Sequence, residues 1–74
     1  MPEIAPGISV DPEVRFGKPV ITGTRVSVDT ILGHLAAGDS IESLMEEYGV
    51  SRADVLAALR YAAEVLGDEE VRAS

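Results

Sequence analysis

Apolar residues recur every three or four positions in three segments of the second half of the chain. This spacing puts apolar side chains on one side of an α-helix, and it predicts helices over about residues 28–37, 40–48 and 51–66. The segments are separated by short polar or glycine-containing stretches. We therefore expect a mostly α-helical fold with a three-helix core over residues 28–66.

Local end signals support the second and third helices. Ser40 stands where an N-cap is expected, and Gly49 supplies a left-handed stop after the second stripe. Ser51 and Asp54 have the spacing of a capping box at the start of the third helix. Gly67 is expected to end that helix.

The second and third helices are joined by only Gly49 and Val50. Two helices joined by a short glycine-containing turn have the geometry of a helix-turn-helix unit. The residues leave two interpretations open. The unit either binds DNA or is a helix pair within a small bundle that touches no DNA.

The first 27 residues have a different pattern, typical of short β-strands. Residues 8–10 alternate like a strand, and residues 19–21 and 26–28 are rich in β-branched side chains. Between the last two segments lies a tight turn in which we expect Gly23 to have a positive φ angle, with Arg25 pointing away from the core. Residues 1–7 are predicted to be an extended lead, and Gly17 lies in a further turn. The chain is thus interpreted as one domain over 1–74, with a β arm (1–27), a helical core (28–66) and an acidic tail (67–74).

The size of the domain indicates that it needs a partner. A chain of 74 residues without cysteine has no disulfide or thiolate metal site to stabilise a small core, which leaves oligomerisation. The third helix is apolar nearly all round, so more than one of its sides must be covered. We expect a homodimer formed by this helix, by the β arm or by both, with Leu56, Leu59 and Ala63 as candidate interface residues.

Charge favours protein partners over nucleic acid. Thirteen acidic residues outnumber six basic ones, whereas a protein that binds phosphate backbones usually has the opposite balance. A basic window nevertheless precedes the helices. The candidate DNA-binding residues are Arg15, Lys18 and Arg25 in that window and Arg52 at the start of the third helix.

The residues do not suggest catalysis. His34 is the only histidine, and the adjacent pairs Glu46-Glu47 and Glu69-Glu70 point in different directions on a helix. We therefore expect no enzyme, no metal and no cofactor. No apolar run approaches the roughly 20 residues of a membrane span and no signal segment opens the chain, so the expected location is cytoplasmic, without membrane association.

A longer pattern resembles a known bacterial family. Its most specific part is Gly17-Lys18-Pro19-Val20-Ile21-x-Gly23-Thr24-Arg25, and the likeness covers roughly residues 8 to 63. The chain is similar to the family catalogued as domain of unknown function 433. One departure is Gly49-Val50, where the family often has proline followed by an apolar residue.

The resemblance implies a homeodomain-like helix-turn-helix fold with N-terminal strands, usually dimeric, and a VapB-like antitoxin role beside a PIN-like ribonuclease toxin. In that role the acidic tail would lie along the basic RNA-binding surface of the toxin. Its candidate toxin-binding residues are Asp68, Glu69, Glu70 and Arg72.

Two functional hypotheses follow. The first is an antitoxin that binds a toxin and its own operator DNA as a dimer. The second is a protein-binding module whose helix-turn-helix is only a scaffold and binds no DNA.

Overall fold

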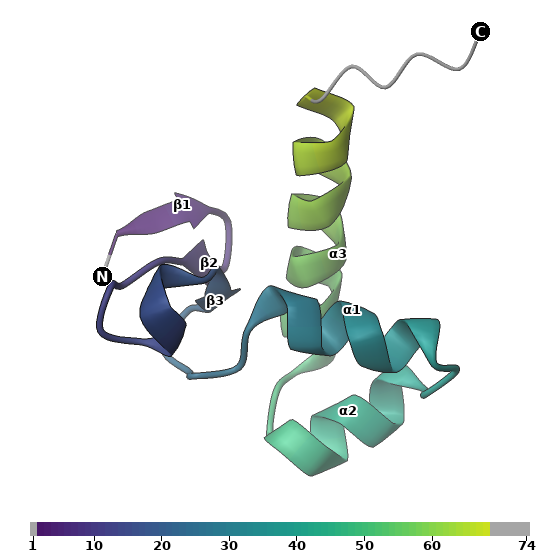
Figure 1. The fold of residues 1–74 in the computed structure, drawn as a ribbon. Coiled ribbons are helices and arrows are strands. Elements are labelled where there is room, and N and C mark those ends of the chain that lie inside the picture. Colours follow the sequence, from purple (N-terminus) through teal and green to yellow (C-terminus); the bar gives the residue numbers. More distant parts are fainter. Residues whose placement is uncertain (1, 69–74) are drawn as a thin grey trace, which may run out of the picture.

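The structure is a computed structural model that describes residues 2–68. In chain order its elements are β1 (Glu3–Ala5), β2 (Ile8–Ser9), the 3-10 helix η1 (Arg15–Gly17), β3 (Val20–Ile21), α1 (Val28–Ala36), α2 (Ile41–Tyr48) and α3 (Arg52–Asp68). The strands lie to one side of α3, and α1 and α2 lie near its N-terminal end (Figure 1). Over the described residues the fold is thus mostly helical, with three α-helices and a short N-terminal sheet, as the apolar spacing predicted.

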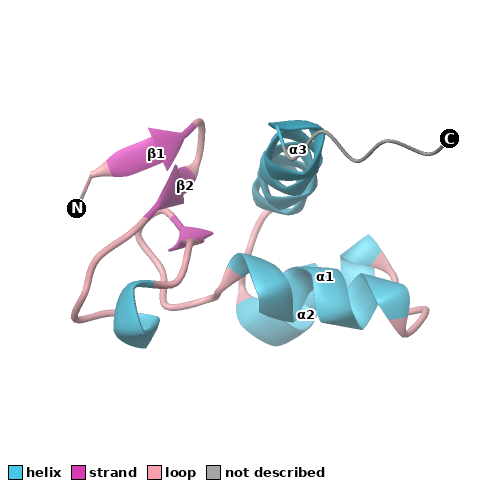
Figure 2. Cartoon of the chain, turned by 45° about the horizontal axis from the view of Figure 1, so that its top comes forward, coloured by secondary structure: helices cyan, strands magenta, loops and turns pink. Residues whose placement is uncertain are grey.

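The sheet is antiparallel, in the order β1-β2-β3. Ile8 lies opposite Ile21, and Ser9 lies opposite Val20. All four of these residues are buried. Strands this short are marginal alone, and β2 and β3 are stabilised by packing against α3. Figure 2 shows the strands as a separate group beside the helices.

Two expectations for the arm are wrong. Residues 3–5 form β1, where only an extended lead was predicted, because their backbone pairs with β2 although their side chains are largely exposed. The segment 26–28 does not form a strand. Ser27 makes only an isolated bridge to Val20, and Val28 already begins α1.

The turn between these segments is as predicted. Gly23 has a φ of 81°, a backbone conformation that residues with a Cβ avoid. The Ile21 N–H donates to the Val26 carbonyl over 2.9 Å and closes the turn. Arg25 is exposed, as expected.

The predicted helix ends are confirmed for α2 and for the start of α3. The Ser43 N–H donates to Ser40 Oγ over 3.0 Å. Gly49 has a φ of 70° and follows α2 directly. Ser51 and Asp54 form the reciprocal capping box: each backbone N–H donates to the side chain of the other residue, over 2.9 Å and 3.1 Å. These contacts make the turn between α2 and α3 rigid.

The end of α3 differs from the expectation. The helix continues through Gly67 to Asp68. Gly67 does not have the positive φ of a helix-ending glycine. A glycine inside a helix lowers the stability of the helix without ending it, so α3 continues past this residue.

The core lies where the N-terminal half of α3 meets the other elements. Its buried apolar members are Ile8, Val20, Ile21, Val28, Ile31, Leu44, Val50, Val55, Ala57 and Ala58. Two serines are also buried, and both are satisfied by side-chain hydrogen bonds: Ser9 to Thr22 over 2.6 Å and Ser27 to Asp29 over 2.5 Å. The arm and the helices therefore share one core.

Candidate functional site

The two halves of α3 have different surroundings. Val55 and Ala58, in the first half, are fully buried between α1, α2 and the sheet. In the second half Val65 is 40% exposed and Leu66 is 61% exposed. In Figure 1 this half rises past α1. Large apolar side chains on it therefore face solvent in the single chain.

The predicted dimer residues form a stripe on α3. Leu56, Leu59 and Ala63 follow one another at spacings of three and four, so they lie on one side of the helix. All three are exposed, with Leu56 at 43% and Leu59 at 38%. The structure thus places these residues together on an exposed side of α3, which borders the core because Leu59 lies one turn after the buried Val55.

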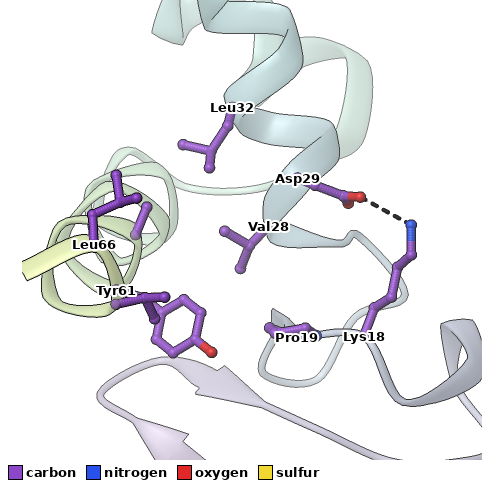
Figure 3. Close-up of a pocket in the computed structure, with 9 residues that line it drawn as sticks. Lys18, Pro19, Val28, Asp29, Leu32, Tyr61 and Leu66 are labelled. Atoms are coloured by element: carbon purple, nitrogen blue, oxygen red, sulfur yellow. Dashed lines mark hydrogen bonds and ion pairs between the residues drawn. The ribbon is translucent and has the colours of Figure 1, made fainter. Parts of the chain in front are cut away.

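A second apolar surface, which the sequence reasoning missed, is a groove of about 420 Å³ beside the stripe. Its lining residues are Lys18, Pro19, Val28, Asp29, Leu32, Tyr61, Ala62, Val65 and Leu66. Figure 3 shows Val28 and Leu32 of α1 facing Tyr61 and Leu66 of α3, with Pro19 at one end. A partly enclosed apolar concavity of this size is typical of a binding site. The apolar excess of α3 was the signal available in the sequence, but it did not identify the opposite wall.

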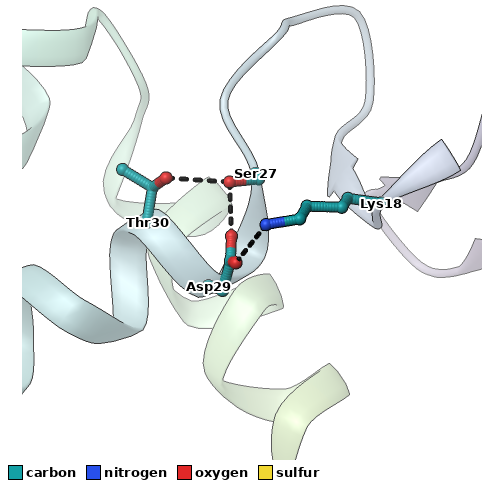
Figure 4. A network of polar contacts seen from close by, with 4 residues as sticks. All are labelled: Lys18, Ser27, Asp29 and Thr30. Atoms are coloured by element: carbon teal, nitrogen blue, oxygen red, sulfur yellow. Dashed lines mark hydrogen bonds and ion pairs between the residues drawn. The ribbon is translucent and has the colours of Figure 1, made fainter. Parts of the chain in front are cut away.

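Lys18 and Asp29 form the polar rim of this groove. Lys18 Nζ lies 2.9 Å from Asp29 Oδ2, and the other oxygen of Asp29 accepts from Ser27 Oγ (Figure 4). These hydrogen bonds, from Ser27 and Lys18, hold the pKa of the Asp29 carboxyl below its usual value. Ser27 also contacts Thr30 over 2.8 Å. The network joins the arm to the first turn of α1 and keeps a carboxylate charged at the rim.

The four candidate DNA-binding cations come from three separate segments. Arg15 opens η1 and Lys18 follows it, Arg25 follows the Gly23 turn, and Arg52 opens α3. Two of them already pair with acids: Lys18 with Asp29, and Arg52 with Glu42 of α2. The backbone N–H of Glu42 and the Arg52 guanidinium lower the pKa of the Glu42 carboxyl, so that this acid stays charged beside Arg52. Both pairs reduce the positive charge available to phosphate.

η1 presents an aromatic residue that the sequence analysis did not single out as functional. Phe16 is 99% exposed. Arg15 and Phe16 have φ angles of 52° and 57°, and Gly17 follows with 80°. Left-handed conformations cost non-glycine residues roughly 1 kcal/mol or more each, so this tip is a strained turn that holds a phenyl ring in solvent.

His34 has a structural position between α1 and α2. Its Nδ1 lies 2.7 Å from Asp39 Oδ2 and its Nε2 lies 2.8 Å from the Tyr48 hydroxyl. Within residues 2–68 no three His, Cys, Asp or Glu side chains are grouped so as to hold a metal ion. No helix among these residues is long and apolar enough to cross a membrane.

The candidate toxin-binding tail is described only at its first residue. Asp68 is exposed at the end of α3. Glu69, Glu70 and Arg72 lie outside the described residues.

Comparison with known proteins gives one positive finding. No curated protein and no solved structure matches the chain significantly. The family model described as "Protein of unknown function (DUF433)" matches residues 8–62, which include the arm from β2 onward, α1, α2 and most of α3. The chain belongs to this DUF433 family.

Proposed function

We propose that this chain is the antitoxin-like component of a type II toxin-antitoxin pair, with a homeodomain-like helix-turn-helix and a VapB-like role. It acts as a homodimer and binds a PIN-like ribonuclease toxin. The observation that carries the proposal is the uncovered apolar surface of α3. Leu56, Leu59 and Leu66 are all more than a third exposed in a domain with a small core.

Two apolar surfaces suit a protein with two protein partners. The stripe of Leu56, Leu59 and Ala63 and the groove beside it are neighbouring surfaces of α3 with different residues. A dimeric antitoxin needs one contact for its second copy and another for the toxin. Large apolar residues are exposed at both places, and they would form the desolvated centre of an interface once a partner covers them.

Charge supports the toxin as one of these partners. The chain carries a net charge of −7, and a ribonuclease needs a basic surface to hold RNA. Asp68 is exposed at the end of α3, and the acidic residues Glu69 and Glu70 follow it in the sequence. Complementary charge of this kind accelerates association and disfavours wrong partners.

A second candidate is a protein-binding module that binds no DNA. Specific observations favour it: Arg52 is paired with Glu42 at the start of α3, and Lys18 is paired with Asp29. DNA binding through these residues would have to break or share both pairs. Operator binding therefore remains the less supported part of the antitoxin proposal.

Co-purification tests whether the stripe, which the sequence predicted as a dimer interface, serves as the toxin contact. The proposed partner, a PIN-like ribonuclease, is co-expressed with the wild type, Leu56→Asp and the control Ala53→Asp, which also adds an acid at an exposed position of α3. We expect the wild type and the control to retain the ribonuclease and Leu56→Asp to lose most of it. Equal retention by all three variants would contradict a toxin contact at the stripe, and no retention by any of them would contradict the antitoxin role.

A mobility-shift assay on the upstream DNA distinguishes the two candidates. If operator DNA is bound, Arg25→Ala and Arg52→Ala should each weaken the complex, and wild-type binding should fall steeply with salt. An unchanged tight complex in both variants would mean that another surface binds DNA. No shift with any protein favours the module without DNA binding.

A further inference from the structure

Phe16 and the α3 groove are complementary apolar features, one projecting and one concave. The ring of Phe16 is 99% exposed, and the groove is lined mainly by aliphatic side chains. Phe16 precedes Lys18 and Pro19 by only two and three residues, and both of these line the groove. The apolar projection and one wall of the apolar cavity are therefore close together along the chain.

The turn that presents Phe16 is built into the backbone. The Gly17 N–H donates to the Val14 carbonyl and the Lys18 N–H to the Arg15 carbonyl, each over 3.1 Å. These bonds hold two successive non-glycine residues in the left-handed region. Strain of this kind persists only where the surrounding structure enforces it, and it often marks a recognition site.

We propose that Phe16 of each copy inserts into the groove of the second copy, so that the dimer exchanges two identical contacts. The inference rests on the homodimer of the proposed function and assigns its surface. In a two-fold dimer the same patch meets itself, and a projection adjacent to its complementary cavity satisfies this requirement twice. A buried phenyl ring removes roughly 150–250 Å² from water, enough to act as an interface anchor.

Charge at the rim agrees with this pairing. Arg15, next to Phe16, is exposed, and the groove rim of the second copy carries the Asp29 carboxylate. Hydrogen bonds keep that carboxylate ionised. A guanidinium arriving with the phenyl ring would therefore meet an acid at the edge of an apolar cavity. The stripe of Leu56, Leu59 and Ala63 is then left for the toxin.

Photocrosslinking tests the contact while keeping an aromatic ring at position 16. Phe16 is replaced by p-benzoylphenylalanine in the full chain, and isotope-labelled and unlabelled copies are mixed so that contacts between copies are recognised by mass. We expect crosslinks to α3 residues 61–66 or to Leu32 of the other copy. A dimer that crosslinks only elsewhere overturns the exchange but leaves the proposed function intact. A wild-type chain that is monomeric overturns both the exchange and the dimer.

Matched substitutions give an independent measure. Phe16→Ala should raise the dimer dissociation constant at least tenfold and Phe16→Leu by less, whereas Leu56→Asp should leave it unchanged. Because Phe16 makes almost no contact within its own chain, Phe16→Ala should keep the melting temperature of the dilute monomer. Dimerisation lost in Leu56→Asp and kept in Phe16→Ala would assign the stripe to the second copy and overturn the proposal. If Phe16→Ala impairs only toxin retention, the ring belongs to the toxin contact, which overturns it equally.

Discussion

The N-terminal and C-terminal halves of α3 are both rich in alanine and branched aliphatic residues, but the buried residues of the helix all lie in its N-terminal half. Val55 and Ala58 are fully buried, whereas Leu66 is 61% exposed. The difference shows that the apolar pattern of a helix indicates how much of its surface must be covered in total, and not which chain covers it. Part of that burial is supplied within the chain, and we infer that the remainder is supplied by other chains.

The same substitution placed in each half should give the largest contrast. Ala58→Asp buries a charge with no room for water, and it should cost about 4 kcal/mol or more. The stability expected for a chain of this size is only roughly 4–11 kcal/mol, so this variant should be largely unfolded. Ala63→Asp should change the stability of the dilute monomer by less than about 0.5 kcal/mol. Circular dichroism and urea titration measure both. If Ala63→Asp is as damaging as Ala58→Asp at high dilution, the exposure of the second half is wrong.

Gly49, in the turn before α3, and Gly67, in the last turn of α3, allow a second comparison between the two ends of this helix. Gly49 precedes the helix in the left-handed region, with open space around it, so Gly49→Ala should cost about 1 kcal/mol through backbone strain alone. Gly67 is helical and also has open space, so Gly67→Ala should add a few tenths of a kcal/mol to the free energy of unfolding. Thermal unfolding shows whether Gly49→Ala lowers the melting temperature and Gly67→Ala raises it. A loss of stability in Gly67→Ala would mean that the helix stops before this residue, as the sequence had suggested.

The rim of the groove gives the smallest predicted effect. The pKa of the Asp29 carboxyl is lower in the folded chain than in the unfolded chain. The ionised carboxylate therefore stabilises the folded chain at pH values above the ordinary carboxyl pKa near 3.8, and this stabilisation is lost as the pH falls through the lower pKa of the folded chain. Asp29 is well exposed, so Asp29→Asn should cost only about 0.2–1 kcal/mol near neutral pH. The difference from the wild type should disappear in acid. A difference that grows on acidification would contradict the assigned direction.

Local features of this fold could be predicted from the sequence, because a few neighbouring residues determine them. Ser40, Gly49 and the pair Ser51 and Asp54 each form the cap that their spacing indicates. The positive φ of Gly23 follows from the turn that surrounds it. Strand β1 was missed because backbone hydrogen bonds to β2 define it, and the sequence pattern of its side chains gives no sign of this pairing.

The candidate site depends on contacts between distant segments. The groove brings Pro19 and Leu32 to α3, and the pair of Arg52 with Glu42 joins two helices. No short sequence window contains both partners of either contact. Phe16 was missed for a different reason: an aromatic residue in a small domain is normally part of the core, and its full exposure follows from the backbone of η1.

Sedimentation equilibrium of the full-length chain, from low to high micromolar concentration, tests most directly whether a second copy covers α3. We predict a reversible increase in mass from 7.8 kDa to twice this value, and we expect Phe16→Ala to need a higher concentration for the same increase. A mass of 7.8 kDa at every concentration would contradict it.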